Sequence, residues 1–259
     1  MLATERRRII TEMVSEARSV PITDIAERLG VSLETVRRDL EQLDRSGQIR
    51  RVRGGAVRPT HSATEEPSFP ARKHLAAAEK REIAGLALGL LEDARTIFID
   101  LGTTALALAD ALLGHYSGTV VTPSMRIAKV LCADPRITVL MPGGIVRGGD
   151  IFVSGATARA FLAEIYPDVA FIGTGGLDAE AGVTDFDFDQ ADAKKLIMQN
   201  SARSYALVDS SKVGVRAPFR VCAAEAFDGV LSDSRIDAAD LDALRGQGVK
   251  VIVGENAKG

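Results

Sequence analysis

The sequence predicts an α/β protein in two parts, a small helical part at the N-terminus and a larger part in which strands alternate with helices. Apolar residues recur at helical spacing over residues 9–43, and short β-rich runs separated by helical stretches make up most of the rest. Between them, residues 58–70 contain three prolines and little apolar periodicity, which is typical of a linker. We therefore expect one domain at 3–58, a linker at 59–75 and a second domain at 76–259.

Three short helices are expected in the N-terminal domain. Helical spacing runs from Ile9 to Ala17, from Ile22 to Leu29 and from Leu33 to Leu43. Gly30 is a suitable C-cap and Ser32 a suitable N-cap, so only about three residues connect the second helix to the third. Such a short connection is the spacing of a helix-turn-helix.

A short hairpin is expected after the third helix. The run Ile49–Val52 has the composition of a strand, Arg53–Gly55 contains two glycines suited to a turn, and Ala56–Val57 returns as the second strand. These residues predict a wing beside the helix-turn-helix, which makes the N-terminal domain a winged helix-turn-helix.

The larger domain is expected to hold a mostly parallel sheet covered by helices, because its strands and helices alternate. Ligands of such sheets bind at the carboxyl ends of the strands. The expected strands are Thr96–Asp100, Thr119–Thr122, Ile137–Met141, Val169–Gly173, Tyr205–Asp209, Gly229–Ser232 and Lys250–Val253. The expected helices are Glu79–Leu91, Ala105–Leu113, Met125–Leu131, Ala156–Ile165, Gln190–Ser201 and Ala238–Leu244.

Composition excludes several classes of protein. With 46% hydrophobic and 26% charged residues, the chain is neither mostly disordered nor collagen-like. No apolar run reaches the roughly 18 residues of a membrane span and the N-terminus lacks a signal peptide, so we expect a cytoplasmic protein with no membrane partner. Cys132 and Cys222 form no CxxC motif and the three histidines are scattered, so we expect buried thiols and no metal site.

The net charge of −3 is divided unevenly along the chain. Residues 1–58 contain 12 Arg, no Lys and 9 Asp or Glu, a charge of +3, and the remainder carries −6. Because the basic part is small and all its cations are arginine, we expect it to bind a polyanion. The third helix has one apolar face, which leaves the opposite face free for that contact.

DNA is the expected polyanion, because the second helix of a helix-turn-helix inserts its N-terminal residues into the major groove. The hairpin should reach the adjacent DNA backbone, and its glycines allow a close approach. The expected DNA-binding residues are Ser32, Thr35, Arg37, Arg38, Arg51, Arg53, Gly54 and Gly55. The alternative is that Arg37 and Arg38 are ordinary surface charges paired with Glu34, Asp39 or Glu41.

Two motifs in this domain resemble one family closely. The run Val31-Ser-Leu-Glu-Thr-Val-Arg-Arg-Asp-Leu40 and the hairpin Arg50-Arg-Val-Arg-Gly-Gly-Ala56 are similar to the recognition helix and wing of the DeoR family of bacterial transcriptional repressors. The resemblance implies that residues 3–58 bind operator double-stranded DNA. Because operators usually have repeated half-sites, it also implies a homo-oligomer, a dimer or a tetramer.

The clearest ligand site expected in the larger domain follows its first strand. In Ile99-Asp100-Leu-Gly102-Thr103-Thr104, a glycine turn, two hydroxyls and a helix N-terminus come together, which suits a phosphate. The segment matches neither the P-loop nor the dinucleotide-binding pattern, and the alternative is a plain turn with a helix cap. With three further strand ends, the expected effector-binding residues are Asp100, Gly102, Thr103, Thr104, Ser124, Gly143, Gly144 and Lys212.

Residues 76–235 resemble the effector domain of the same family. That domain is related to ribose-5-phosphate isomerases and glucosamine-6-phosphate deaminases, and the resemblance implies a sensor of a phosphorylated sugar or sugar alcohol. Thr122-Pro-Ser124 and Gly173-Thr-Gly-Gly-Leu-Asp178 depart from the common family pattern, whereas Gly182–Gln190 is similar to glycerol-3-phosphate-responsive members. The implied function is repression of a carbohydrate or sugar-alcohol catabolic operon, relieved by the effector.

Two other classes of function are weighed against this interpretation. A phosphosugar isomerase or deaminase carrying a DNA-binding domain would need an acid/base pair, but Asp178 and Asp209 have no histidine nearby and the Asp-Gly-Ala-Asp-Glu pattern of the isomerases is missing. An architectural DNA-binding protein would leave the strand-end sites unexplained. No cofactor is expected, and the acidic run Asp185, Asp187, Asp189 and Asp192 lacks the Gly and Glu of a calcium loop.

Overall fold

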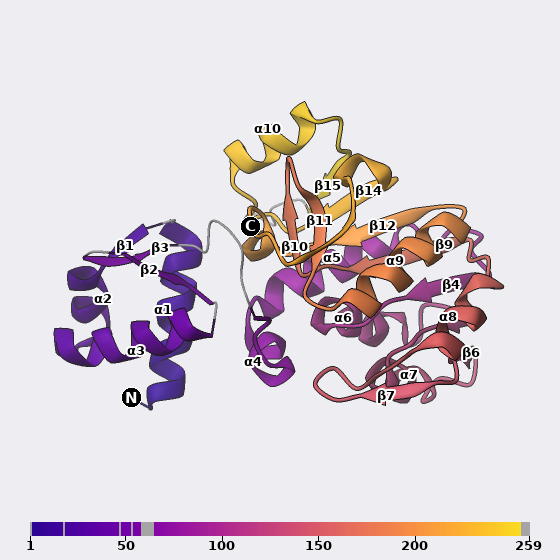
Figure 1. The fold of residues 1–259 in the computed structure, drawn as a ribbon, viewed down its shortest axis with the longest axis horizontal. Helices are drawn as coiled ribbons and strands as arrows, with labels where there is room; N and C mark the ends of the chain where they lie inside the picture. Colours follow the sequence, from indigo (N-terminus) through magenta and orange to yellow (C-terminus); the bar gives the residue numbers. More distant parts are fainter. Residues whose placement is uncertain (1, 18, 47, 53, 58–64, 255–259) are drawn as a thin grey trace.

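The fold is described from a computed structural model, in which residues 2–17, 19–46, 48–52, 54–57 and 65–254 are placed. Its elements form two groups, and Figure 1 shows the N-terminal group, from α1 to β3, beside the larger α/β part. Arg53 and the first part of the expected linker, residues 59–64, lie outside the described residues.

The N-terminal group is a winged helix-turn-helix with one strand more than the sequence predicted. Its core contains Ile10, Ile25, Val36, Leu40 and Ile49, which are all buried. The added strand β1 precedes α2 and pairs antiparallel with β3. The two wing strands, β2 and β3, therefore belong to a three-stranded sheet in the order β1-β3-β2. The elements are α1 (Ala3–Ala17), β1 (Ser19–Pro21), α2 (Ile22–Leu29), α3 (Leu33–Arg45), β2 (Arg50–Val52) and β3 (Gly55–Val57).

The larger part is built on a parallel sheet of seven strands in the order β15-β14-β12-β9-β4-β5-β6. This confirms the predicted α/β class. From β4 the chain runs outward to β6 on one side and from β9 to β15 on the other, so the order reverses between β4 and β9. The strands are β4 (Thr96–Ile99), β5 (Gly118–Val121), β6 (Ile137–Leu140), β9 (Val169–Gly173), β12 (Ser204–Leu207), β14 (Gly229–Ser232) and β15 (Val251–Val253).

Each face of this sheet has its own core, because successive strand residues point to opposite faces. Ile97 and Ile99 of β4 pack with α5, α6 and α7, whereas Phe98 packs on the other face with α8, α9 and α10. All three side chains are at most 2% exposed. The helices are α5 (Ala77–Leu88), α6 (Thr103–Leu112), α7 (Met125–Leu131), α8 (Ala156–Ala163), α9 (Phe188–Asn200) and α10 (Ala238–Gly246).

Two small antiparallel sheets, which were not predicted, extend the larger part. One has the order β10-β11-β13 and contributes Leu177 and Val183 to the core on the α9 face. The other is a hairpin of β7 and β8 beside α7. The elements are β7 (Ile145–Arg147), β8 (Phe152–Ser154), β10 (Gly176–Asp178), β11 (Gly182–Asp185) and β13 (Phe219–Cys222), with short 3-10 helices η1 (Ser210–Lys212) and η2 (Ala224–Ala226).

The second half of the expected linker is structured. Residues 69–74 form α4 (Phe69–His74), and its Phe69 is buried in the core beside α6. A Pro-rich composition led us to expect a linker there, but one aromatic anchor and a proline at the start of a helix suffice to fix a short helix. The expectation of two buried thiols is wrong for Cys132, which is exposed at the C-terminal end of α7.

Candidate functional site

The recognition helix α3 is set against α2 by the capping residues that the sequence indicated. Gly30 ends α2 with a left-handed backbone at φ 62°. Ser32 begins α3, where its hydroxyl accepts a hydrogen bond from the Thr35 backbone N–H at 3.3 Å. Asp39, on the inner side of α3, is buried and accepts hydrogen bonds from the Arg6 guanidinium of α1, one of them at 3.2 Å. These contacts fix the angle at which α3 presents its outer face.

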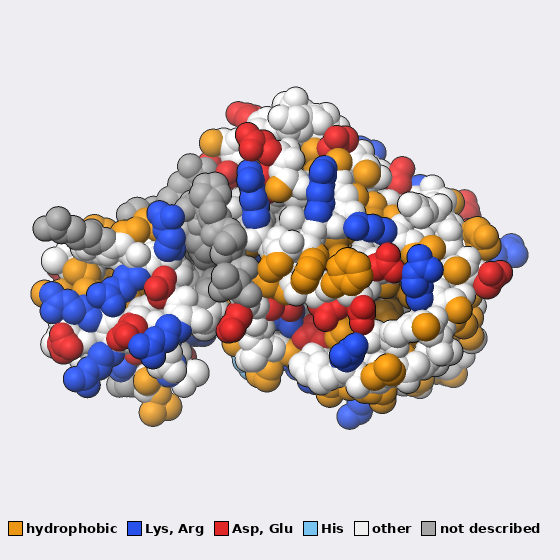
Figure 2. Space-filling model, in the orientation of Figure 1, with side chains coloured by type: hydrophobic (Ala, Val, Ile, Leu, Met, Phe, Trp, Pro, Cys, Tyr) orange, Lys and Arg blue, Asp and Glu red, His pale blue; other side chains and the backbone are white. Residues whose placement is uncertain are grey.

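The outer face of α3 presents both predicted arginines. The side chains of Arg37 and Arg38 are 57% and 79% exposed, and both lie near Glu34, at 3.4 Å and 3.9 Å. The alternative interpretation, in which Arg37 and Arg38 pair with acidic neighbours on the surface, is therefore correct in part, because both arginines pair with Glu34. Exposed pairs of this kind contribute only about 0.3–0.5 kcal/mol, so they compete weakly with a DNA phosphate. Figure 2 shows the basic and acidic side chains interleaved over this domain.

The wing has a different organisation from the one we expected at Gly55. Gly54 is exposed at the turn with φ 94°, and Arg51 is exposed on β2. Gly55 is buried, and a Cβ atom there would lie 2.2 Å from the Val20 carbonyl oxygen. The close approach that Gly55 permits is therefore to strand β1 and not to DNA. Arg53 lies outside the described residues.

The second candidate site lies where the strand order reverses, at the carboxyl ends of β4 and β9, the position at which open α/β sheets bind ligands. Gly102 precedes α6 with φ 105°, a conformation that favours glycine, and the N-terminus of α6 opens into a hollow. Of the predicted residues, four line this hollow: Gly102, Thr103, Thr104 and Lys212. We call it the effector hollow.

The other predicted effector residues lie elsewhere. Asp100 is buried below the β4–α6 turn, and Ser124 is buried at the start of α7, where its hydroxyl accepts a hydrogen bond from the Ile127 N–H at 3.4 Å. Gly143 and Gly144 follow the edge strand β6, and a Cβ on Gly144 would lie 2.5 Å from the Ser154 carbonyl oxygen. Gly144 therefore lets the chain pass β8. Neither glycine lines the hollow with Thr103.

Asp100 belongs to a buried ionic group. The Lys194 ammonium of α9 lies 3.1 Å from Asp100, pairs with Asp185, and donates a hydrogen bond to the Gly173 carbonyl oxygen at 2.8 Å. The Gly173 N–H donates to Asp100 at 3.0 Å. Burial raises the pKa of Asp100, with Lys194 opposing, and burial alone would lower the pKa of Lys194, but the two carboxylates hold it above its usual value. This group joins the ends of β4 and β9 and so positions the turn above it.

Five charged residues that line the hollow were not among the predicted effector-binding residues. Two of them, Glu66 and Arg72, lie in the expected linker, and Asp150 lies between β7 and β8. The other two are Asp185 and Lys194 of the buried ionic group. Arg72 of α4 is buried, pairs with Asp150 and Glu66, the latter at 3.0 Å, and donates to the Pro67 carbonyl oxygen. Glu66 and Asp150 also line the hollow. Charged residues in a polar stretch look like solvated surface, so no pattern singled them out.

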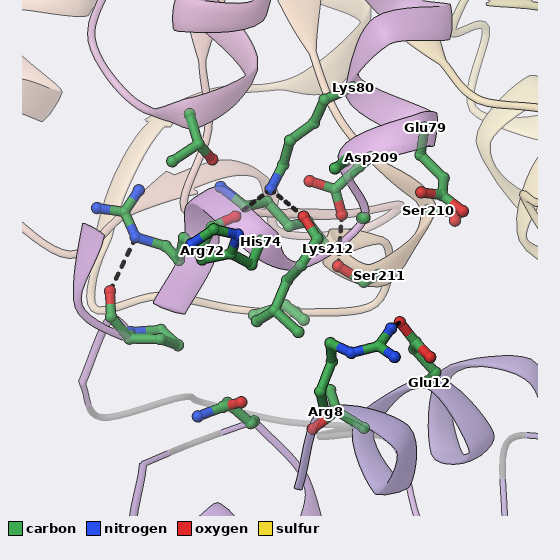
Figure 3. Close-up of a pocket in the computed structure, with 18 of the residues that line it drawn as sticks. Arg8, Glu12, Arg72, His74, Glu79, Lys80, Asp209, Ser210, Ser211 and Lys212 are labelled. Carbon is green, nitrogen blue, oxygen red and sulfur yellow. Dashed lines mark hydrogen bonds and ion pairs between the residues drawn. The ribbon is translucent and has the colours of Figure 1, made fainter. Parts of the chain in front are cut away.

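A larger cavity of about 430 Å³ adjoins the hollow. Thr103 and Lys212 line both, and Arg8 and Glu12 of α1 face the cavity from the N-terminal domain (Figure 3). Figure 3 also shows Lys80 pointing at the end of α4, where its ammonium donates to the Arg72 and Leu75 carbonyl oxygens at 2.5 Å and 2.6 Å. Burial lowers the pKa of Lys80 to about 8.

The acidic run before α9 has structural roles. Asp187 caps α9 by accepting a hydrogen bond from the Gln190 N–H at 2.9 Å, and Asp185 pairs with Lys194. Among the placed residues, no group of three or more histidine, cysteine or acidic side chains is arranged to hold a metal ion. No helix in the described part of the chain is long and apolar enough to cross a membrane.

Known family models match both parts of the chain. Residues 6–62 match the DeoR-like helix-turn-helix domain, and residues 75–234 match the DeoR C-terminal sensor domain. The chain belongs to the DeoR family of transcriptional regulators. The predicted resemblance is thereby confirmed. Most residues that line the effector hollow fall within the sensor-domain match, whereas Glu66 and Arg72 precede it.

Similar proteins cover nearly the whole chain. GlpR of Haloferax volcanii is 33% identical over 98% of this chain and 99% of its own, and GolR of Listeria innocua is 31% identical over 98% and 100%. The glycerol-3-phosphate regulon repressor of Escherichia coli is 30% identical over 90% and 92%. These relatives are transcriptional regulators. This chain, as a member of the same family, is likewise a regulator and not an enzyme.

Among solved structures, ribose 5-phosphate isomerase A of Methanocaldococcus jannaschii overlaps with 53% of the chain and 55% of its own. The identity is 17% and the TM-score is 0.39, values that carry no conclusion about activity.

Proposed function

We propose that this DeoR regulator represses an operon for carbohydrate or sugar-alcohol catabolism and leaves its operator when a phosphorylated sugar or sugar alcohol binds in the effector hollow. Since its target is operator DNA, we place the protein in the cytoplasm. Glycerol 3-phosphate is the first candidate effector, because one relative is named a glycerol-3-phosphate regulon repressor. In addition, the segment Gly182–Gln190, which leads into α9, is similar to the same segment of glycerol-3-phosphate-responsive members of the family.

One observation supports this effector class above the others. Two cations, Arg72 and Lys212, meet the N-terminus of α6 in the hollow, and the buried Asp150 Oδ2 beside them has no hydrogen-bond partner in the described structure. Cations and a helix N-terminus suit a phosphate. A free carboxylate oxygen suits a sugar hydroxyl as donor. These groups are complementary to a phosphate and to a hydroxyl. Because the hollow itself has a volume of only about 20 Å³, the remainder of a phosphorylated polyol would extend into the adjoining cavity of about 430 Å³.

A thermal-shift screen tests the proposal. Phosphorylated trioses, pentoses and hexoses and glycerol 3-phosphate are added to the purified protein, and a true effector raises the melting temperature while its unphosphorylated counterpart does not. A ligand at 100 times its Kd stabilises the native state by about 2.7 kcal/mol. A screen in which no phosphorylated compound stabilises the protein would contradict the proposed effector class.

Two variants connect the hollow to release of DNA. Thr103→Val and Lys212→Ala should bind operator DNA as the wild type does but need at least about tenfold more effector for release, since hydrogen bonds to a charged group contribute about 1.5–3 kcal/mol. Lys129→Ala, an exposed lysine on α7 outside the hollow, is the control. Gel-shift titrations with effector measure the difference, and release of both variants at wild-type concentrations would place the site elsewhere.

We also infer a homo-oligomer held through the β7–β8 hairpin. Ile145 and Val146 of β7 are 59% and 55% exposed, and β7 pairs only with β8 among the described strands. An apolar edge strand left open in this way is a pairing site for a second copy.

Sedimentation velocity tests this interface. Ile145→Lys should convert a dimer or tetramer to smaller species, because a buried charge opposes association. Phe188→Lys, which places the same charge on another exposed apolar residue (64% exposed), should leave the assembly intact. An assembly unchanged by Ile145→Lys would exclude β7.

A further inference from the structure

The effector hollow already contains an anion that belongs to the chain. Glu66 lines it together with Arg72 and Lys212, and the Glu66 Oε1 lies 3.0 Å from the Arg72 guanidinium. A Cβ atom placed on Gly102, at the start of α6, would lie 3.9 Å from the same guanidinium. The Glu66 carboxylate therefore lies among the cations that suit a phosphate.

The contact of Glu66 is held weakly by electrostatics. Burial raises the pKa of its carboxyl, and the charges of Lys212 and Arg72 only partly compensate, because Asp150 and Asp185 oppose them. The free-energy cost of removing this carboxylate from water is therefore not fully offset by its attraction to the cations. A phosphate dianion brings more charge and more acceptor oxygens to the same cations, so it can replace the carboxylate.

Glu66 also lies on the path between the two domains. It precedes α4 in the segment that leads from the wing into the sensor domain, and the Arg72 side chain holds this segment at two points, Glu66 and the Pro67 carbonyl oxygen. Lys80 fixes the other end of α4 through the carbonyl oxygens of Arg72 and Leu75. The ion pair of Glu66 is thus an attachment of the interdomain segment to the effector site.

We propose that Glu66 is an intramolecular competitor of the effector, whose phosphate must displace the Glu66 carboxylate from Arg72 and thereby detaches the segment that precedes α4. The proposal rests on the proposed function, since it takes the hollow as the phosphate site. Occupancy of the hollow would reach the DNA-binding domain because the same cation, Arg72, holds either the interdomain segment or the ligand.

Binding of inorganic phosphate and of glycerol 3-phosphate by the full-length protein tests the competition. Glu66→Gln removes the charge with little change in shape, and Glu65→Gln alters the exposed neighbouring residue as a matched control. If Glu66 occupies the site about nine-tenths of the time, its removal tightens the apparent Kd about tenfold. Isothermal titration calorimetry should show this gain for Glu66→Gln and none for Glu65→Gln.

A second measurement reports on the segment itself. The Arg72 backbone N–H donates to the carbonyl oxygen of Ser68, in the segment before α4, at 3.0 Å. Exchange of this amide should be faster in Glu66→Gln than in wild type, and wild type saturated with phosphate should approach the variant. Faster exchange together with tighter binding supports the competition. Unchanged or weaker phosphate binding by Glu66→Gln, while wild type binds, overturns the role of Glu66 and leaves the proposed function standing.

The remaining outcome separates the two proposals. If neither wild type nor Glu66→Gln binds inorganic phosphate or glycerol 3-phosphate, and no phosphorylated compound stabilises either protein, both the competitor and the effector class are wrong.

Discussion

Replacing Arg38 with alanine is expected to lower operator affinity roughly 5- to 150-fold, which corresponds to about 1–3 kcal/mol for a base contact, and to leave the fold intact. Arg38 lies in the first half of α3, the half that enters the major groove in a helix-turn-helix, and its only placed ion pair is the 3.9 Å contact with Glu34. Its side chain has no part in the core of the domain.

Arg45→Ala is the matched control. Arg45 is on the same helix, is similarly exposed at 76%, and pairs with Glu41 at 2.6 Å, but it lies in the last turn of α3. Operator fragments selected by the wild type from random DNA serve for anisotropy titrations at several salt concentrations. Equal affinities for wild type and Arg38→Ala at every salt concentration would contradict the assignment of α3 as the reading helix.

Replacing Lys194 with methionine should have the largest effect on stability. The substitution removes the cation between Asp100 and Asp185, which are buried, and breaking a buried pair in this way costs about 3–5 kcal/mol. Lys195→Met, at the exposed neighbouring position on α9, should change the free energy of unfolding by less than about 0.5 kcal/mol. Denaturant unfolding of both variants measures the difference. If Lys194→Met were as stable as Lys195→Met, the ionic group would not contribute to the stability of the fold.

The loss in Lys194→Met should also depend on pH. Burial raises the pKa of Asp100, and without the opposing cation its folded-state pKa stays further above the unfolded value, so the folded variant binds more protons than the unfolded chain. The free energy of unfolding then falls as pH rises through the folded pKa. The gap between the variant and wild type should therefore be smaller at pH 5 than at pH 8, in thermal unfolding at both values.

Much of the fold follows from local pattern. The strands β4, β9 and β14 fall where apolar runs predicted them, because a strand buried on both faces leaves an uninterrupted apolar segment in the sequence. β1 was missed, since three residues carry no periodicity of their own and Ser19–Pro21 become a strand only by pairing with β3.

The candidate site was predictable only in part. Gly102 and Thr103 were predicted from a local pattern, a glycine turn at the end of a strand. Gly143 has the same pattern, but it follows β6, which lies two strands away from β4. No single segment of the sequence determines the order of the strands in the sheet. Arg72 and Glu66 reach the site from a polar stretch whose burial depends on Phe69 packing against a distant helix. Such contacts are properties of the assembled fold.

The two cores that share β4 determine how accurately the effector hollow is placed. A shift of this strand by one residue would move Gly102 about 3.3 Å and turn every β4 side chain to the opposite layer, so that Phe98 would meet the space shaped for Ile97 and Ile99. Both layers would be disrupted together. The β4–α6 turn, where we propose that the effector binds, is thus positioned by apolar side chains in two core layers below it.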